Sequence, residues 1–549
     1  MVASEGWDYI IAGGGLAGCV LANRLAQYQS SARILVIEAG PDVSGNKDIL
    51  QYNSLNFIGG KFDWGYKTVP QKHYDGRQVD LPSGRAVGGG SVINGCGWFR
   101  GSKADFDSWA EVVDDNRWSY EGQLPYFKMT ERWYNGENAE NHGQDGRLQI
   151  ESPSSTKRIY PLAGVTEQAW EEVGVHKLPG NDMNAGENLG FGELNENRSH
   201  GARQIAPFAY PLDGEGITVL ADTLVGSVLV DTNDGVRATG VRLADGIEIH
   251  SKAVILAAGA YRTPQLLMLS GLGPKETLEK HGIETKVDIP QVGKNFNDHI
   301  MVHLNWKLKD PSKGHALGSS NPLFANPEFA MGNPLSHVAC TDIPRDGLEA
   351  AIAKDEGKVE PDHYLLKRHW AMMENLVMYL AVPPLSIDGT HISNALMAMK
   401  PTSRGMVTIA SKDPADAPLL DPNYYATEVD KYVWRHSLRQ ITALMTGDTA
   451  LGREVSGETP RPGFAPLIVD ASDEYLDSRM RAQGISTFHG SSTCSMGTVV
   501  DSGLKVKGVQ NLWIADASVF PISIGAHIQA AVYALAEQAA VIISKDNSA

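Results

Sequence analysis

The first forty residues of the chain constrain its fold more than any other segment. Residues 8–12 form a short apolar run that predicts a buried strand, and the glycine motif at 13–18 follows it directly. Residues 19–26 contain no helix breaker and place apolar side chains on one face, which predicts a helix. Residues 33–38 predict a second strand that ends in the acid Glu38. Together these features predict a complete βαβ unit that binds a nucleotide.

Each part of this unit has a physical reason. The glycines allow a tight turn and let the backbone approach a pyrophosphate, whose charge the amides at the helix start would stabilise. Glu38 would accept hydrogen bonds from ribose hydroxyls, and its charge would repel a ribose phosphate, which disfavours an NADP-like ligand. This unit alone leaves both NAD and FAD open.

A second glycine-rich segment occurs at residues 83–94. It has too many glycines for the interior of a helix or strand, and Arg85, Ser91 and Asn94 supply polar groups for a ligand.

From this segment onward the sequence resembles the glucose-methanol-choline (GMC) family of flavin oxidoreductases. Residues 83–94, 259–273 and 292–299 resemble three of the family's signature segments, and residues 489–537 resemble its C-terminal part. The resemblance implies an α/β fold (α+β overall), with a Rossmann-like FAD-binding domain and a β-sheet-based substrate-binding domain built from insertions.

We expect the FAD-binding domain to be discontinuous. Its predicted segments are residues 1–155, 200–305 and 485–549, because the nucleotide-binding motifs return in these parts of the chain. The substrate-binding domain and cap are predicted at residues 156–199 and 306–484.

The motifs and the resemblance together predict the cofactor contacts. The resemblance implies that Val225 holds the adenine, that Asp516 contacts the ribityl chain, and that the helix predicted directly after Gly525 faces the flavin pyrimidine. The predicted cofactor-binding residues are Gly13, Gly15, Leu16, Ala17, Gly18, Glu38, Ala39, Arg85, Gly89, Ser91, Asn94, Gly97, Val225, Ala258, Asp516, Ala517, Ile528 and Gln529. Members with covalent flavin commonly present a histidine in the glycine-rich loop, and residues 90–94 contain none, so noncovalent FAD is expected.

Two histidines near the C-terminus are the candidate catalytic residues. Oxidation of an alcohol to a carbonyl requires removal of the hydroxyl proton and transfer of a hydride from the carbinol carbon to flavin N5. A neutral imidazole suits the proton transfer. The resemblance implies that His489 is the general base and that His527 is a second hydrogen-bond partner for the same oxygen, a position held by asparagine in many members. His299, next to Asp298, is interpreted as half of a structural hydrogen-bonded pair.

The leading interpretation is therefore an FAD-dependent alcohol oxidase or dehydrogenase acting on a small-molecule alcohol. Trp64 and Phe488 are tentative substrate contacts, and either is equally explained by packing. A hydroxynitrile lyase-type flavoprotein without redox turnover is the alternative. The electron acceptor, O2 or another molecule, stays open, as do the alcohol and the oligomeric state.

Composition limits the partners. The net charge is −17, from 48 basic and 65 acidic residues, which argues against nucleic acid and anionic membranes. The four cysteines are too far apart for a metal site and too few for a disulfide framework, so no metal and a reducing compartment are expected. The N-terminal residues show no signal-peptide pattern, so a cytoplasmic location is expected, and a mature secreted form stays open. Residues 526–543 are largely apolar, but Gln529, Glu537 and Gln538 interrupt them, which favours a buried helix over a membrane span.

Overall fold

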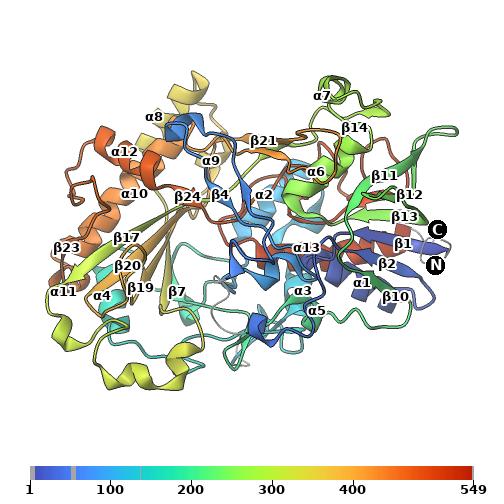
Figure 1. The fold of residues 1–549 in the computed structure, drawn as a ribbon. Helices are drawn as coiled ribbons and strands as arrows, with labels where there is room; N and C mark the ends of the chain where they lie inside the picture. The colour runs from blue at the N-terminus through green and yellow to red at the C-terminus, as the bar shows by residue number, and fades with distance from the viewer. Residues whose placement is uncertain (1–5, 51–56, 136–137, 547–549) are drawn as a thin grey trace.

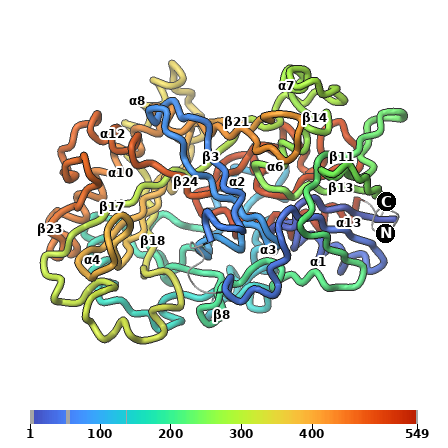
Figure 2. The backbone as a smooth tube through the Cα atoms, viewed as in Figure 1, coloured from blue at the N-terminus to red at the C-terminus, as the bar shows by residue number. Residues whose placement is uncertain are grey.

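The computed structural model of the chain describes residues 6–50, 57–135 and 138–546. Two large sheets stand at opposite ends of the molecule, and helices and loops occupy the space between them (Figure 1). The backbone trace brings both ends of the chain together beside the first sheet (Figure 2).

The first sheet has a parallel core. Its strand order is β10–β2–β1–β13, with β25 on the other side of β13, and all of these pairs are parallel. The bounds are β1 (Trp7–Ala12), β2 (Ile34–Ile37), β10 (Ile217–Leu220), β13 (Glu248–Leu256) and β25 (Leu512–Ile514). The first part of β13 also carries an antiparallel extension made of β12 (Arg237–Leu243) and β11 (Val225–Asp231). The βαβ unit predicted from the sequence is confirmed, since α1 (Leu16–Tyr28) connects β1 to β2.

Two helices pack against each other next to this parallel core. Helix α1 lies against α13 (Gln529–Asp546), and Arg24 of α1 forms an ion pair with the fully buried Glu537 of α13 at 2.7 Å. The predicted buried helix near the C-terminus is therefore present. Within the described ranges, none of the helices combines the length and the apolar character that crossing a bilayer requires.

The start of this helix differs from the prediction. The predicted start after Gly525 is wrong, because α13 begins at Gln529, where the amide of Val532 donates to the carbonyl of Ile528. Gly525 is held outside the helix, since its amide donates to Asp105 at 3.0 Å and its carbonyl accepts from Asn188 at 2.8 Å. The segment before the helix is therefore an anchored loop.

The second sheet is antiparallel, with strand order β23–β17–β20–β19–β18–β7 and with β24 also paired to β17. The bounds are β7 (Gly190–Glu193), β17 (Ile300–Leu308), β18 (His337–Thr341), β19 (Met373–Met378), β20 (His391–Ala398), β23 (Val455–Glu458) and β24 (Ile485–Ser486). The predicted domain boundaries stay a prediction, and β17 runs across the boundary predicted at residue 305.

Alternation along β17 gives this sheet two different faces. Ile300, Val302, Leu304 and Trp306 are buried in the apolar core that also contains residues of the helices outside the sheet. The helices on this side are α4 (Ala163–Glu172), α8 (Arg345–Glu356), α10 (Glu428–Thr446), α11 (Ala450–Glu454) and α12 (Asp473–Gln483). Met301 and His303 point to the opposite face, toward the first sheet. The predicted α/β class, with a separate β-sheet region, is confirmed.

The remaining helices and strands lie outside the two large sheets. The remaining helices are α2 (Lys103–Val113), α3 (Tyr120–Thr130), α5 (Ala206–Ala209), α6 (Gly259–Leu269), α7 (Lys275–Lys280) and α9 (Tyr364–Lys367). The remaining strands are β3 (Tyr66–Lys67), β4 (Asp80–Leu81), β5 (Glu131–Arg132), β6 (Leu148–Gln149), β8 (Arg198–Ser199), β9 (Ala202–Arg203), β14 (Leu272–Gly273), β15 (Val287–Asp288), β16 (Lys294–Phe296), β21 (Gly405–Thr408) and β22 (Leu419–Asp421).

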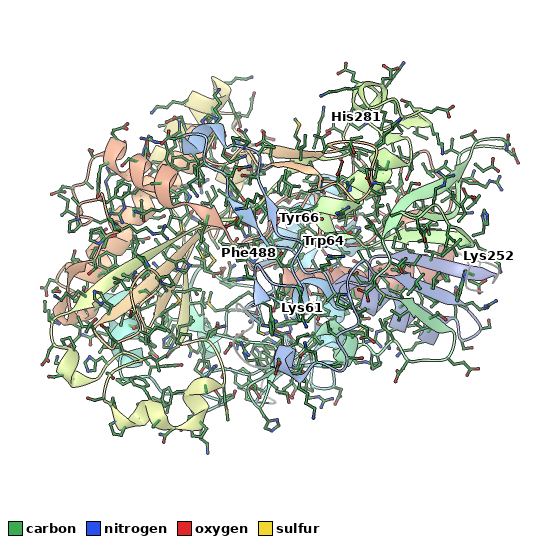
Figure 3. All side chains as sticks on the ribbon, viewed as in Figure 1. Lys61, Trp64, Tyr66, Lys252, His281 and Phe488 are labelled. Atoms are coloured by element: carbon green, nitrogen blue, oxygen red, sulfur yellow. The ribbon has the colours of Figure 1, made fainter. Side chains whose placement is uncertain are left out.

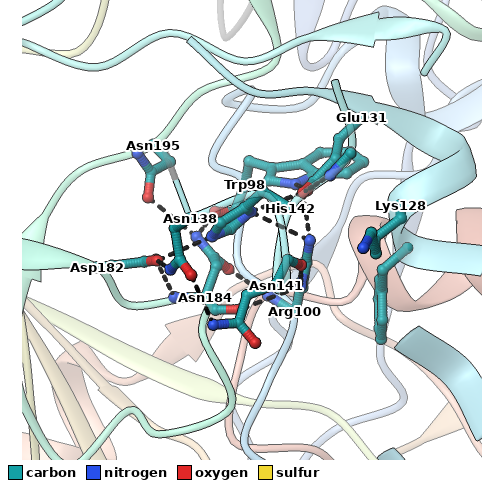
Figure 4. A network of polar contacts seen from close by, with 12 residues as sticks. Trp98, Arg100, Lys128, Glu131, Asn138, Asn141, His142, Asp182, Asn184 and Asn195 are labelled. Atoms are coloured by element: carbon teal, nitrogen blue, oxygen red, sulfur yellow. Dashed lines mark hydrogen bonds and ion pairs between the residues drawn. The ribbon is translucent and has the colours of Figure 1, made fainter. Parts of the chain in front are cut away.

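A buried charged network fixes the loop that follows the second glycine-rich segment (Figure 4). Arg100 and Glu131 form an ion pair in which both side chains are fully buried. His142 lies between Glu131 at 2.7 Å and Asp182 at 2.8 Å, and its ring stacks on Trp133 with centroids 3.6 Å apart. The imidazole of His142 therefore bridges two carboxylates, and it shares Glu131 with Arg100.

Candidate active site

A cavity of about 610 Å³ lies between the two sheets. One wall comes from the carboxyl ends of β1, β2 and β13, where parallel sheets commonly bind ligands. The opposite wall comes from the inward face of the second sheet, on β17, β19 and β20.

The glycine turn after β1 lets a ligand approach the backbone closely. Gly13 has a φ of 111°, and a Cβ there would lie 2.4 Å from the carbonyl oxygen of Ala257. Gly15 is the N-cap of α1 and offers no side-chain cap, so the amides of the first turn remain available to a ligand. These amides and the helix dipole make this end of α1 suitable for a pyrophosphate.

Glu38 lies at the cavity wall, where it was predicted. Its carboxylate accepts hydrogen bonds from the amides of Gly14 at 2.9 Å and Gly40 at 2.8 Å. Burial raises the pKa of Glu38 to about 7, although these two amides and the charge of Arg85 oppose the shift.

Most of the predicted cofactor residues line the same cavity. These are Gly13, Gly15, Leu16, Ala17, Glu38, Ala39, Gly89, Asn94, Gly97, Val225, Ala258, Asp516, Ala517, Ile528 and Gln529. They come from segments far apart in the sequence, and the fold brings them to one surface.

Three predicted contacts do not line the cavity. A Cβ on Gly18 would lie 2.0 Å from the carbonyl oxygen of Gly13, so this glycine lets α1 pack on the turn. Ser91 is fully buried and donates to the carbonyl of Gly88 at 2.6 Å. The exposed Arg85 places its guanidinium 5.0 Å from the ring centroid of Trp64. The glycine-rich motifs alone could not separate these packing roles from ligand contacts.

The residues present fit the FAD that the resemblance implies. Gly90, Gly95 and Gly259 also line the cavity, and a Cβ built on any of them would meet no protein atom within 4 Å. Side chains at these positions would therefore project into open space. This glycine-lined surface, the uncapped start of α1 and the acid Glu38 together suit a flat ligand that carries a pyrophosphate and a ribose.

The loop that carries His489 is held by a buried carboxylate. Asp298 accepts hydrogen bonds from the amide of His489 at 2.9 Å, from the hydroxyl of Ser486 at 2.5 Å and from the hydroxyl of Tyr424. Burial raises the pKa of Asp298 to about 6, and these hydrogen bonds oppose the increase. The contacts of Asp298 fix the backbone that presents His489 to the cavity.

The imidazole of His489 belongs to a directed hydrogen-bond chain. Its Nδ1 lies 2.9 Å from Nδ1 of His299, and Nε2 of His299 lies 2.9 Å from Oγ of Ser523. Ser523 donates to the carbonyl of Met399 at 3.1 Å, and because this carbonyl only accepts, Ser523 accepts from His299. This assignment makes His299 Nδ1 the acceptor of a proton on His489 Nδ1.

The chain determines which nitrogen of His489 is basic. Thr487 donates to the carbonyl of His299 at 3.0 Å, so its oxygen is a second acceptor for His489 Nδ1, also at 3.0 Å. Among the described residues, Nε2 of His489 has no protein partner, and this nitrogen keeps its lone pair. Burial lowers the pKa of His489 well below its usual value, and the neighbouring His527 and His299 lower it further. Burial likewise lowers the pKa of His299 to about 3.

His527 stands beside His489, with ring centroids 4.9 Å apart at 81°. Its Nε2 lies 2.8 Å from Oε1 of Glu374, a residue of β19 that is 1% exposed. The pair of histidines predicted from the sequence therefore meets at one cavity, as the resemblance implies.

The two tentative substrate residues also line this cavity. Figure 3 shows Trp64 and Phe488 in the central region between the sheets. The guanidinium of Arg262 lies 4.2 Å from the ring centroid of Trp64 and donates to Tyr66 Oη at 2.6 Å. Phe488 is 36% exposed and has a φ of 67°, a strained conformation for an aromatic residue.

Two functional neighbours were missed by the sequence reasoning. The interpretation of His299 as a side-chain partner of Asp298 is corrected, because its ring nitrogens contact His489 and Ser523. The position of His299 in the family segment 292–299 was the sequence feature that could have indicated this role. Glu374 was not singled out, since an acid within an apolar strand carries no motif.

Comparison with known proteins agrees with the resemblance. Residues 7–301 and 401–536 match the models of the N-terminal and C-terminal parts of the GMC oxidoreductases. The chain is 39% identical over 544 residues to the GMC-type oxidoreductase acuG of Aspergillus aculeatus, covering 98% of this chain and 99% of that protein. It is 33% identical over 567 residues to an oxygen-dependent choline dehydrogenase of Staphylococcus aureus, covering 98% and 94%.

A solved structure supports the same assignment. Pyridoxine 4-oxidase from Mesorbium loti superposes with a TM-score of 0.82 at 27% identity, covering 97% of this chain and 98% of that one. With a family model that matches more than half of the chain and a relative of similar length above 30% identity, this chain belongs to the GMC oxidoreductase family.

Proposed function

We propose that this protein is an FAD-dependent oxidoreductase that oxidises the CH–OH group of an alcohol to a carbonyl. The observation that carries the proposal is the directed chain from His489 through His299 and Ser523, which leaves a basic Nε2 at the cavity. The names of the similar proteins, a dehydrogenase and an oxidase, support a redox reaction.

In this proposal His489 is the general base. The alcohol O–H proton moves to Nε2 of His489 as the carbon–oxygen double bond forms. The lowered pKa keeps the imidazole neutral at neutral pH, so it is ready to accept a proton before the substrate arrives. The acceptors at Nδ1, on His299 and Thr487, stabilise the imidazolium that results.

His527 has the complementary role. Its Nε2 donates to the buried Glu374, which leaves Nδ1 for the substrate oxygen. We assign His527 as the second hydrogen-bond partner of that oxygen, and Glu374 as the residue that orients its ring. The two histidines then contact one oxygen from two sides.

The cofactor is proposed to be FAD, held noncovalently. When bound, FAD accepts the hydrogen and the electron pair that leave the carbinol carbon. The α1 amides would hold the pyrophosphate, Glu38 a ribose, and the turn at Asp516 the ribityl chain. The proposed FAD-binding region is residues 1–155, 200–305 and 485–549, and the remainder of the chain forms the substrate-binding region. Acid precipitation should release the flavin into the supernatant, whereas a covalent link would keep it in the pellet.

Anaerobic titration of the flavin spectrum tests the proposal. We expect an alcohol to bleach the flavin band, and readmission of air then distinguishes O2 from another acceptor. His489→Ala should keep the flavin and slow its reduction by about 10²-fold or more, whereas the exposed His250→Ala should not change the rate. Consumption of a cyanohydrin without bleaching would favour a lyase instead, and an unchanged rate in His489→Ala would remove His489 as the base.

A further inference from the structure

The substrate side of the cavity has an ordered wall on the second sheet. Its inward side chains, which we call the sheet wall, are Met301, His303, Leu376, Met378, Ala395 and Met397. The strand register arranges them in rows. Met301, Met397 and Glu374 are aligned in one row, and His303, Ala395 and Leu376 form the next.

The sheet wall is apolar apart from His303. Methionine and leucine side chains give a soft surface that packs well against a flat or aromatic body. A polyol would lose the hydration of several hydroxyl groups against such a wall and regain few hydrogen bonds. The composition of the wall therefore selects against sugars.

The cavity also selects against charged substrates. Its charged lining residues among those described are Glu38, Asp516 and Arg262, and the first two belong to the proposed cofactor site. Arg262 already lies over the ring of Trp64, where a cationic substrate would otherwise find its best aromatic face. Glu374 is engaged by His527, so no carboxylate of the described sheet wall remains to pair with a cation.

His303 is the unexplained polar group of this wall. Its ring lines the cavity, and none of the other described side chains bonds to it; its Nδ1 is shielded from the cavity, so the ring is open to a ligand at Nε2. Burial and the nearby Arg461 lower the pKa of His303 to about 4, so the ring is neutral at neutral pH. A ligand group that hydrogen-bonds to this accessible nitrogen would satisfy it inside an otherwise apolar wall.

The position of His303 defines the distance between the two hydrogen-bonding sites of the substrate cavity. It follows Met301 by two residues on β17, which places its row about 7 Å beyond the row of Glu374, the partner of His527. That separation matches a compact ring with oxygen substituents at two places. One oxygen would meet the histidine pair, and the other would meet His303.

Resting on the proposed function, we propose that the substrate is an uncharged alcohol with an aromatic body and a second hydrogen-bonding group, and that His303 binds this second group. A hydroxybenzyl alcohol represents the class. His303 is then a specificity-determining residue that contacts the substrate away from the reacting carbon.

The test uses the FAD-loaded protein and anaerobic reduction by benzyl alcohol, 3- and 4-hydroxybenzyl alcohol, choline and D-glucose. We expect the better hydroxybenzyl isomer to bind about tenfold more tightly than benzyl alcohol, with choline and glucose inactive. His303→Leu should abolish that preference, since one hydrogen bond is lost. His303→Gln should restore part of the preference, and His250→Leu, at an exposed site outside the cavity, should keep it.

The outcomes separate this inference from the proposed function. Faster flavin reduction by choline or glucose, or an unchanged preference in His303→Leu, would overturn the inference and leave alcohol oxidation intact. If dithionite reduces the flavin and no alcohol does, the proposed function fails. Perturbation of the flavin spectrum by 4-hydroxybenzaldehyde against benzaldehyde then still tests the His303 contact, and equal affinities would contradict it.

Discussion

The Nδ1 atoms of His489 and His299 lie 2.9 Å apart, with the two rings nearly perpendicular at 89°. His299 donates from Nε2 to Ser523, so its Nδ1 can accept the proton on Nδ1 of His489. His299 is therefore a positioning residue for the proposed base. This contact joins the loop after β24 to the residue just before β17. The two segments are far apart in the sequence and meet only in the folded protein.

Replacing His299 tests this positioning role. His299→Ala should reduce the rate constant of anaerobic flavin reduction about tenfold, because one acceptor for His489 Nδ1 is lost. Substrate affinity and flavin content should stay near wild type. His299→Gln, whose side-chain oxygen can accept the same proton, should recover most of the rate in stopped flow. Equal rates in the two variants would contradict the hydrogen-bond role.

The lowered pKa of His489 predicts the pH dependence. The base acts in its neutral form, so activity is lost only when pH falls through its folded-state pKa, which lies well below 6.5. The rate constant for flavin reduction should therefore stay constant from pH 8 down to 6.5 and fall at more acidic pH. A decline that begins above pH 6.5 in a pH–rate profile would argue against this environment for His489.

Glu374→Gln tests the partner of His527. The substitution keeps the shape of the side chain and removes the charge that orients the imidazole, so flavin reduction should slow by about 10- to 100-fold. Flavin retention should not change. Glu356→Gln is the matched control, since Glu356 faces the ring of His363 at 3.1 Å on the surface. A rate for Glu374→Gln equal to that of the control would refute the assignment.

Glu38 predicts a pH effect on cofactor binding. Its pKa of about 7 means that the carboxylate form, which we propose accepts from ribose hydroxyls, is depleted below pH 7. Affinity of the flavin-free protein for FAD should therefore fall about tenfold from pH 8 to pH 6, measured by flavin fluorescence. Glu38→Gln should bind FAD weakly without this dependence, and Glu276→Ala, at an exposed site, should behave as wild type. If Glu38→Gln shows the same pH dependence of FAD affinity, ionisation of Glu38 does not cause it.

The buried network predicts a stability effect. Glu131→Gln leaves Arg100 and His142 without their shared carboxylate in a fully buried site, which should lower the free energy of unfolding by about 3–5 kcal/mol. Glu248→Gln removes the partner of Arg242 in an exposed pair and should cost less than about 1 kcal/mol. Denaturant unfolding compares the two, and similar losses would show that the network contributes little.

The sequence, with the family resemblance that it carries, determined the βαβ unit, the histidine pair and most of the predicted residues that line the cavity. Glycine at positions 13 and 15 and the acid at 38 are local requirements of a nucleotide site, and a local pattern reports them directly. The strands of the parallel core could be predicted equally well from the sequence, because strands buried on both faces are continuously apolar.

Tertiary structure alone decided how these residues act. Gly18 and Ser91 share the motifs of ligand-binding residues but pack against the backbone, and the helix expected after Gly525 begins at Gln529 because Asp105 and Asn188 hold the preceding loop. The roles of His299, Glu374 and His303 depend on strand register and on contacts between distant segments. A hydrogen-bond partner more than 150 residues away in the sequence leaves no local pattern, so only the folded arrangement determines it.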